Sequence, residues 1–188
     1  MAILVSGLVL FLGMHLLPTV PRLRATWMSR LGEQGYKGLF SIVSLAGLIL
    51  IVVGYRMADA SERLFAPLPG AAVVAPWAMT LALILFASSH MRAHLRQAVQ
   101  HPMVLGLLIW SGVHLLPNGD VRRTVLFGGF LGYSVIDLLS AVRRDATKSF
   151  VPTVKHDVIA IVAGTIVALV IMAFHRVLFG HAVVPFGV

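Results

Sequence analysis

The sequence has no cysteine and few charged residues. Without cysteine, the chain can form no disulfide, hold no iron–sulfur cluster through thiolates and attach no haem covalently through a C-x-x-C-H motif. Charged residues make up 12% of the 188 positions and apolar residues make up 59%, whereas soluble domains average about 25% charged. These proportions predict an integral membrane protein, in which any haem would be held by histidine or methionine without covalent links.

Acidic residues are scarcer than basic ones. Seven Asp and Glu stand against 15 Lys and Arg, which gives a formal net charge of +8. Almost no sequence is left for an extramembrane domain, so this excess predicts basic loops against anionic lipid headgroups. We therefore expect membrane lipid as a partner and no nucleic acid.

Six apolar runs occupy most of the chain, at residues 2–17, 38–55, 71–89, 102–116, 121–141 and 158–179. A helix of about 20 residues crosses a bilayer, and the first and fourth runs are shorter than this. Because the runs do not alternate with a period of two, we predict an all-α fold. It is a single domain over residues 1–188, built as a polytopic membrane bundle of about six transmembrane helices.

Lys and Arg are divided unequally between the two sides that six crossings define. The loops after the first, third and fifth runs hold ten of them, and the other side holds five. Cytoplasmic loops are enriched in Lys and Arg. We therefore expect both termini on the non-cytoplasmic side of the cell inner membrane.

One phrase closes both of the shorter runs: "GMHLLP" at residues 13–18 and "GVHLLP" at residues 112–117. Its recurrence is compatible with two three-helix halves of inverted topology, a 3+3 repeat. Each copy places a histidine, His15 or His114, one turn before a proline. A histidine within a membrane span indicates a functional site if it faces the bundle interior. The alternative is an interfacial histidine that hydrogen-bonds a carbonyl or a headgroup.

Three further histidines lie between the third and fourth runs. His90 and His94 are four residues apart, as part of an extension of the third helix, so we expect them to share a helix face; His101 would fall close to that face if the helix ran on. No carboxylate is near them in sequence, and no metalloprotease motif is present. We interpret the segment as a basic face that meets lipid phosphates through Arg92 and Arg96.

Two other features are interpreted as structural. Asp137 is expected to form an ion pair with Arg143 or Arg144. The glycines of "FGGFLG" at residues 127–132 and of "GLFSIVSLAG" at residues 38–47 are expected where helices pack closely.

Several segments together resemble the NnrU family in order and spacing. They are "GLVLFLGMHLLP" with "GEQGYKGLFSIVSLAGLILIVVGY", then "HPMVLGLLIWSGVHLLPNGD", and then "LFGGFLGYSVIDLLS". The family is named for a genetic link to denitrification, through the expression or activity of nitrite and nitric oxide reductases. The same pattern is more distantly similar to 15-cis-ζ-carotene isomerase, a membrane enzyme that holds haem b between two histidines.

The resemblance implies that His15 and His114 bind the iron of haem b. His114 lies thirteen residues after His101 of the "HP..G…W" motif, at the position of the isomerase's second ligand. In that enzyme, a cysteine three residues before the second ligand can replace a histidine on iron, and the position here is Ser111. Residues in or beside these motifs complete the candidate cofactor-binding set: His101, Tyr36, Lys37 and Trp110.

Helix direction provides a test of this pairing. The first and fourth helices should run in opposite directions, so His15 and His114 could differ in depth by about 10–20 Å. Both must lie within about 2 Å of one iron. The conflict softens if the two short helices end inside the bilayer. Otherwise His15 would pair with His90 or His101.

Three functional hypotheses remain open. The first is a haem-b protein accessory to denitrification, with a redox, nitric-oxide-linked or reductase-support role and a matching protein partner. The second is a haem-dependent cis–trans isomerase of a carotenoid-like polyene, which needs an exchangeable iron position; Ser111 favours the first. The third is haem-free, either a transporter of lipids or small molecules or a methyltransferase-like protein.

Overall fold

The computed structural model describes residues 1–145, 149–185 and 187, and every regular element in this part of the chain is a helix. Five helices are long and apolar enough to cross a membrane, and α5, with 14 residues, is shorter. The predicted fold class, a polytopic helical membrane bundle, is confirmed. The longer helices are α1 (Ala2–Leu16), α2 (Pro21–Met57), α3 (Ala71–Ser88), α5 (Pro102–Leu115), α6 (Val121–Arg143) and α7 (Val154–Ala173). The short elements are η1 (Leu17–Thr19), α4 (His94–Val99) and α8 (His175–Phe179).

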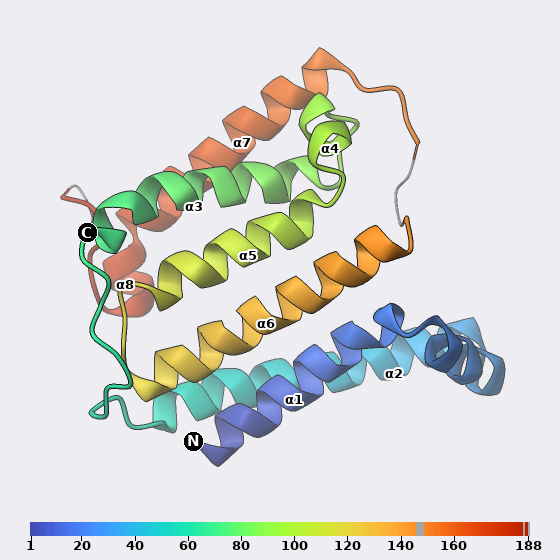
Figure 1. The fold of residues 1–188 in the computed structure, drawn as a ribbon, viewed down its shortest axis with the longest axis horizontal. Coiled ribbons are helices and arrows are strands. Elements are labelled where there is room, and N and C mark those ends of the chain that lie inside the picture. The colour runs from blue at the N-terminus through green and yellow to red at the C-terminus, as the bar shows by residue number, and fades with distance from the viewer. Residues whose placement is uncertain (146–148, 186, 188) are drawn as a thin grey trace.

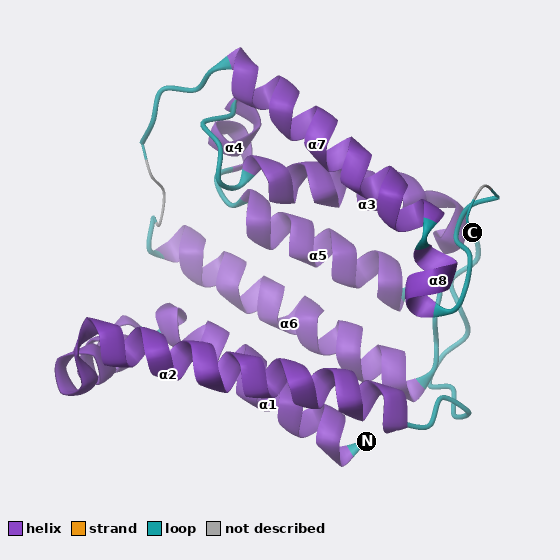
Figure 2. Ribbon diagram, turned by 180° about the vertical axis from the view of Figure 1, so that it is seen from behind, coloured by secondary structure: helices purple, strands orange, loops and turns teal. Residues whose placement is uncertain are grey.

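The longer helices lie side by side in the order α2, α1, α6, α5, α3, α7 (Figure 1). Successive long helices run in opposite directions. Both termini therefore lie at one end of the bundle, together with the loop at residues 58–70 and the turn at 117–120. We call this the terminal end. Figure 2 shows the same row from behind, with the other connections gathered at the opposite end.

At three places the helices begin or end at other residues than the apolar runs predict. α2 begins at Pro21, where a missing backbone N–H has no cost, and it bends at Gly32, whose φ of 69° is left-handed. α3 ends at Ser88 and α4 is a separate helix, so the prediction that one helix carries His90 and His94 is wrong. The last run divides into α7 and α8.

Glycines bring α1 and α2 into backbone contact. A Cβ added at Gly7 would lie 2.6 Å from the backbone nitrogen of Ile51. A Cβ at Gly54 would collide with the backbone nitrogen of Leu4. Small residues allow this approach between membrane helices. Leu4, Leu8, Leu12 and Ile51 form a cluster of buried side chains at this contact.

The glycines of α6 have different surroundings. A Cβ at Gly128 or Gly132 would meet no atom within 4 Å, and one at Gly129 would make only ordinary contacts with side chains of α1. The prediction that "FGGFLG" marks close helix packing is therefore wrong. α1 rests on α6 over a smaller surface than on α2.

Candidate functional site

His15 lies near the end of α1, among aromatic side chains from three helices. Its Nδ1 is 2.7 Å from the carbonyl oxygen of Phe11, one turn earlier. Its ring stacks on Phe11 at a centroid distance of 4.2 Å and contacts Phe40 at 5.0 Å. Tyr133 of α6 presents its edge at 6.4 Å. The side chain is thus half-buried between α1, α2 and α6.

His114 lies near the end of α5 in a closely similar setting. Its Nδ1 is 2.8 Å from the carbonyl oxygen of Trp110, again one turn earlier. Its ring stacks on Phe127 of α6 at 4.8 Å and contacts Trp110 at 5.3 Å. The two "HLLP" histidines therefore share a backbone partner four residues earlier and an aromatic sheath.

This arrangement defines which ring nitrogen is available for chemistry. With Nδ1–H donating to a carbonyl, the neutral imidazole carries its lone pair on Nε2. Among the described residues, neither His15 nor His114 has a hydrogen bond to Nε2. Each ring is therefore oriented to offer Nε2 as a metal ligand or a proton acceptor.

Phe130 of α6 connects the two aromatic groups. Its ring lies 6.0 Å from Phe11 and 5.4 Å from Trp110. His114 is level with Phe127 and His15 is level with Tyr133. These positions are six residues apart on α6, so the two histidines differ in depth by about 9 Å. The expected difference in depth is therefore present, at its lower limit.

The other members of the predicted set are scattered. Trp110 lies in the aromatic group, and Tyr36 is buried beside Phe40 at 6.4 Å. Lys37 points away and pairs with Glu33 at 2.6 Å, with both side chains more than half exposed. The structure thus places Trp110 beside His114, whereas His15 lies in the other aromatic group, beyond Phe130, with Tyr36 at its margin.

His101 lies at the start of α5, at the opposite end from His114. Its Nε2 is buried without a hydrogen-bond partner among the described residues. Thirteen residues of helix separate the two histidines by about 20 Å. They therefore do not belong to one site.

The segment around α4 contains an unforeseen ion pair. His94 Nδ1 lies 2.5 Å from a carboxylate oxygen of Asp157 at the start of α7, while His90 is exposed. The sequence shows no carboxylate near these histidines, because Asp157 lies 63 residues from His94 in the chain and comes beside it only in the fold. Within the described ranges, no group of three or more His, Cys, Asp or Glu side chains is placed to hold a metal ion.

Asp137 is also differently placed than expected. It accepts a hydrogen bond of 3.4 Å from the hydroxyl of Tyr133, and no ion pair between it and Arg143 or Arg144 is present in the described part of the chain. Arg144 instead donates to the carbonyl oxygen of Ser140 at 3.1 Å. The prediction of an ion pair is therefore wrong.

Two histidines near His114 escaped the sequence analysis. His175, buried at the start of α8, places its Nδ1 2.8 Å from the carbonyl oxygen of His181, and the rings are 4.7 Å apart. Both interact electrostatically with His114. Burial, with the nearby His175 and Arg123, lowers the pKa of His181 below its ordinary value. Their only sequence signal was a histidine at the end of an apolar run.

Ser111 is fully buried, and its hydroxyl donates to the carbonyl oxygens of Leu107 and Leu108 at 2.8 and 3.0 Å. The side chain is thus bound to its own helix.

A family model, described as NnrU protein, matches residues 3–183 of the chain. Neither a curated protein nor a solved structure gives a significant match.

Proposed function

The chain belongs to the NnrU family, and we propose that it binds haem b with His15 and His114 as axial ligands. In this proposal it serves denitrification in the inner membrane through a redox or nitric-oxide-linked role, with both termini on the non-cytoplasmic side. The observation that carries the proposal is the repeated geometry of the two histidines. Each has Nδ1 on the carbonyl oxygen one turn earlier and an unbonded Nε2 within aromatic surroundings.

The donor set suits haem iron. A neutral imidazole whose Nδ1–H is bound to a carbonyl is fixed in orientation and is a more basic ligand at Nε2. The surrounding apolar rings limit access of water and thereby tune the reduction potential. When bound, haem b would supply one-electron redox chemistry. The chain supplies the two nitrogens, their orientation and the sheath.

Space for the macrocycle has to come from helix movement. Both nitrogens of a bis-histidine site lie about 2 Å from iron, whereas the two rings here differ in depth by about 9 Å along α6. The rings of Phe11, Phe130 and Trp110 fill the interval. Because α1 packs mainly on α2 and lightly on α6, the α1–α2 pair can shift as a unit and let these rings part.

The redox role is favoured over a polyene isomerase by Ser111. Its hydroxyl is committed to two backbone carbonyls of α5, and serine is a poor substitute for a thiolate on iron. An exchange of axial ligands through this position therefore lacks a donor.

Absorption spectroscopy of the purified protein tests the proposal. Protein from haem-replete cells, or protein titrated with haemin, should show a Soret band and sharp α and β bands on reduction. His15→Ala and His114→Ala should each abolish the low-spin spectrum. His90→Ala is the matched control, because His90 is exposed, and it should keep the wild-type spectrum.

Two results would contradict the proposal. A colourless protein that haemin does not change would exclude haem binding and favour a haem-free function. A wild-type spectrum in either ligand variant would show that the replaced histidine is not a ligand; His175→Ala then tests the nearest alternative to His114.

A further inference from the structure

The loop at residues 58–70 is bound to the turn between α5 and α6 at the terminal end. The backbone nitrogen of Leu64 donates to the carbonyl oxygen of Gly119 at 2.7 Å. The backbone nitrogen of Val121 donates to the backbone carbonyl oxygen of Glu62 at 3.0 Å. A Cβ at Gly119 would collide with the carbonyl oxygen of Phe65, so only glycine permits this contact. These contacts hold the loop in a defined position against the turn.

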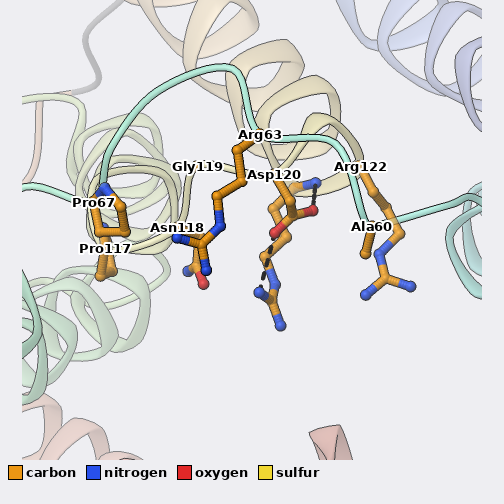
Figure 3. Close-up of a pocket in the computed structure, with 9 residues that line it drawn as sticks. Ala60, Arg63, Pro67, Pro117, Asn118, Gly119, Asp120 and Arg122 are labelled. Carbon is orange, nitrogen blue, oxygen red and sulfur yellow. Dashed lines mark hydrogen bonds and ion pairs between the residues drawn. The ribbon is translucent and has the colours of Figure 1, made fainter.

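A pocket of about 190 Å³ lies between this loop and the turn. It is smaller than sites for drug-sized molecules, which have about 300–1,000 Å³, and suits a single small group. Figure 3 shows Arg63 of the loop and Arg122 of α6 reaching toward the same side of the loop. The lining residues are Ala60, Arg63, Pro67, Pro117, Asn118, Gly119, Asp120, Arg122 and Arg123.

Positive charge exceeds negative charge in the pocket lining. Asp120 is buried and already bound, since it accepts hydrogen bonds from the backbone nitrogen of Arg123 at 2.9 Å and from its guanidinium at 3.0 Å. Arg122 lies over the ring of Tyr55 at 4.4 Å, and its Nη1 donates to the carbonyl oxygens of Tyr55 at 3.3 Å and Ala58 at 3.5 Å, which leaves the second Nη as its donor toward the pocket. Arg63 is exposed at the mouth. The pocket therefore presents guanidinium groups with unused donors.

Asp59, a carboxylate outside the pocket, does not neutralise the excess positive charge of the lining. Asp59 lies near Arg122, and hydrogen bonds from Ser61 hold the pKa of this carboxyl below its ordinary value. Its oxygens are thus engaged by Ser61. The pocket lining itself holds three arginines and one carboxylate, Asp120.

Apolar side chains surround the mouth. Leu64 and Leu68 of the loop are more than half exposed, and Leu116 of the turn is 44% exposed. Exposed leucines beside arginines at the end of a membrane helix are typical of the lipid–water interface. An occupant with a phosphate and acyl chains satisfies both kinds of group.

We propose that this pocket binds the phosphate group of an anionic phospholipid. The phosphate accepts hydrogen bonds from Arg63 and Arg122, because guanidinium groups recognise phosphate through paired N–H donors. The acyl chains lie along the exposed leucines. Asn118, whose side chain donates to the carbonyl oxygen of His114 at 2.8 Å, makes the lipid site a neighbour of His114. The proposal does not depend on haem.

Lipid binding to the full-length protein in a non-ionic detergent is the test, measured by native mass spectrometry with dioleoylphosphatidylglycerol. Arg63→Gln should weaken binding about fivefold, the effect of one basic residue at a membrane surface. Arg63→Lys should lose part of the affinity, because an ammonium group lacks the paired N–H donors of a guanidinium, and an unchanged thermal unfolding midpoint of Arg63→Gln in detergent shows that its loss of binding is not a folding defect. Arg56→Gln is the matched control, because Arg56 is exposed near the same end and lies outside the pocket; it should bind nearly as the wild type does.

Three outcomes would overturn the proposal. Equal losses in Arg63→Gln and Arg56→Gln would indicate diffuse electrostatic attraction. Equal binding of dioleoylglycerol, which lacks phosphate, would indicate an apolar contact alone. Binding of inorganic phosphate that depends on Arg63, without binding of the phospholipid, would indicate a site for the free anion.

Discussion

The two sides of α1 differ in how they are packed. Toward α2, glycines such as Gly7 place backbone against backbone, with a Cβ contact of 2.6 Å that no other residue could accept. Toward α6, large rings fill the interval, and the only glycine contact, at Gly129, is ordinary. Close backbone packing leaves no room for adjustment, whereas an interface of side chains can rearrange. The α1–α2 pair is therefore rigid, whereas the interface between α1 and α6, beside His15, can adapt.

Substitution of the packed glycines should have the largest effect. Gly54→Ala would drive a methyl group into the backbone of Leu4 and should destabilise the fold by about 3 kcal/mol or more. Gly132→Ala, which meets only open space, should stabilise α6 by about 0.5–1 kcal/mol. Thermal unfolding in detergent measures both. Equal unfolding midpoints for the two variants would contradict the proposed difference in packing between the side of α1 that faces α2 and the side that faces α6.

Loss of the central tryptophan should have the next largest effect. Trp110→Ala removes contacts to His114, Phe127 and Phe130. It should cost about 2–3 kcal/mol, less than a fully buried aromatic residue because Trp110 is half-buried. Trp77, which is 78% exposed in α3, is the control, and Trp77→Ala should cost under about 0.5 kcal/mol. Similar losses in both variants would show that the aromatic group contributes no special stability.

A cross-link between α1 and α6 tests whether this interface must open for haem. The chain has no cysteine, so Leu12→Cys with Gly129→Cys can be bridged selectively by a short bifunctional thiol reagent; Leu12 Cδ1 lies 3.5 Å from the position of a Cβ at Gly129. Bridging should weaken haemin binding about tenfold, equivalent to 1.4 kcal/mol. The single-cysteine variants, treated in the same way, should bind as before. Unchanged binding after bridging would show that α1 and α6 need not separate.

The smallest effect should be a pH dependence of the segment after α7. Burial, His175 and Arg123 lower the pKa of His181 in the folded protein, so the unfolded chain binds the proton more readily. The stabilising contribution is therefore complete above the ordinary histidine pKa of about 6.5 and is lost as the pH falls below it. Hydrogen-exchange protection factors of residues 174–185, which correct for the slower intrinsic exchange at lower pH, should fall on acidification to a greater extent in the wild type than in His181→Gln. His90→Gln is the control, and an identical pH profile in His181→Gln would refute the assignment.

The sequence predicted the helices better than their ends. Runs of apolar residues identified all six long helices, because insertion depends on local composition and length. The start of α2 at Pro21 and the division at Ser88 were missed, since amphipathic and interfacial helices carry no long apolar run. The repeated motif singled out His15 and His114, and the structure gives both the same Nδ1 contact with the carbonyl oxygen four residues earlier.

Contacts between distant segments were not predictable in the same way. Asp157 lies 63 residues from His94, and His175 lies far from His114 in the chain. The arginine pocket depends on the docking of the loop at 58–70 on Gly119. A single sequence does not say which loops meet, because such pairings depend on the packing order of the helices.

The length of the apolar runs shows that this is a helical membrane protein, and the repeated motif places two equivalent histidines at helix ends. Both features can be read from short stretches of sequence. Only the tertiary structure decided that α6 stands between those histidines, that α1 is rigid toward α2 and adaptable toward α6, and that three arginines line one pocket. These are properties of side chains brought together from separate helices, and the order of helices in the row sets them.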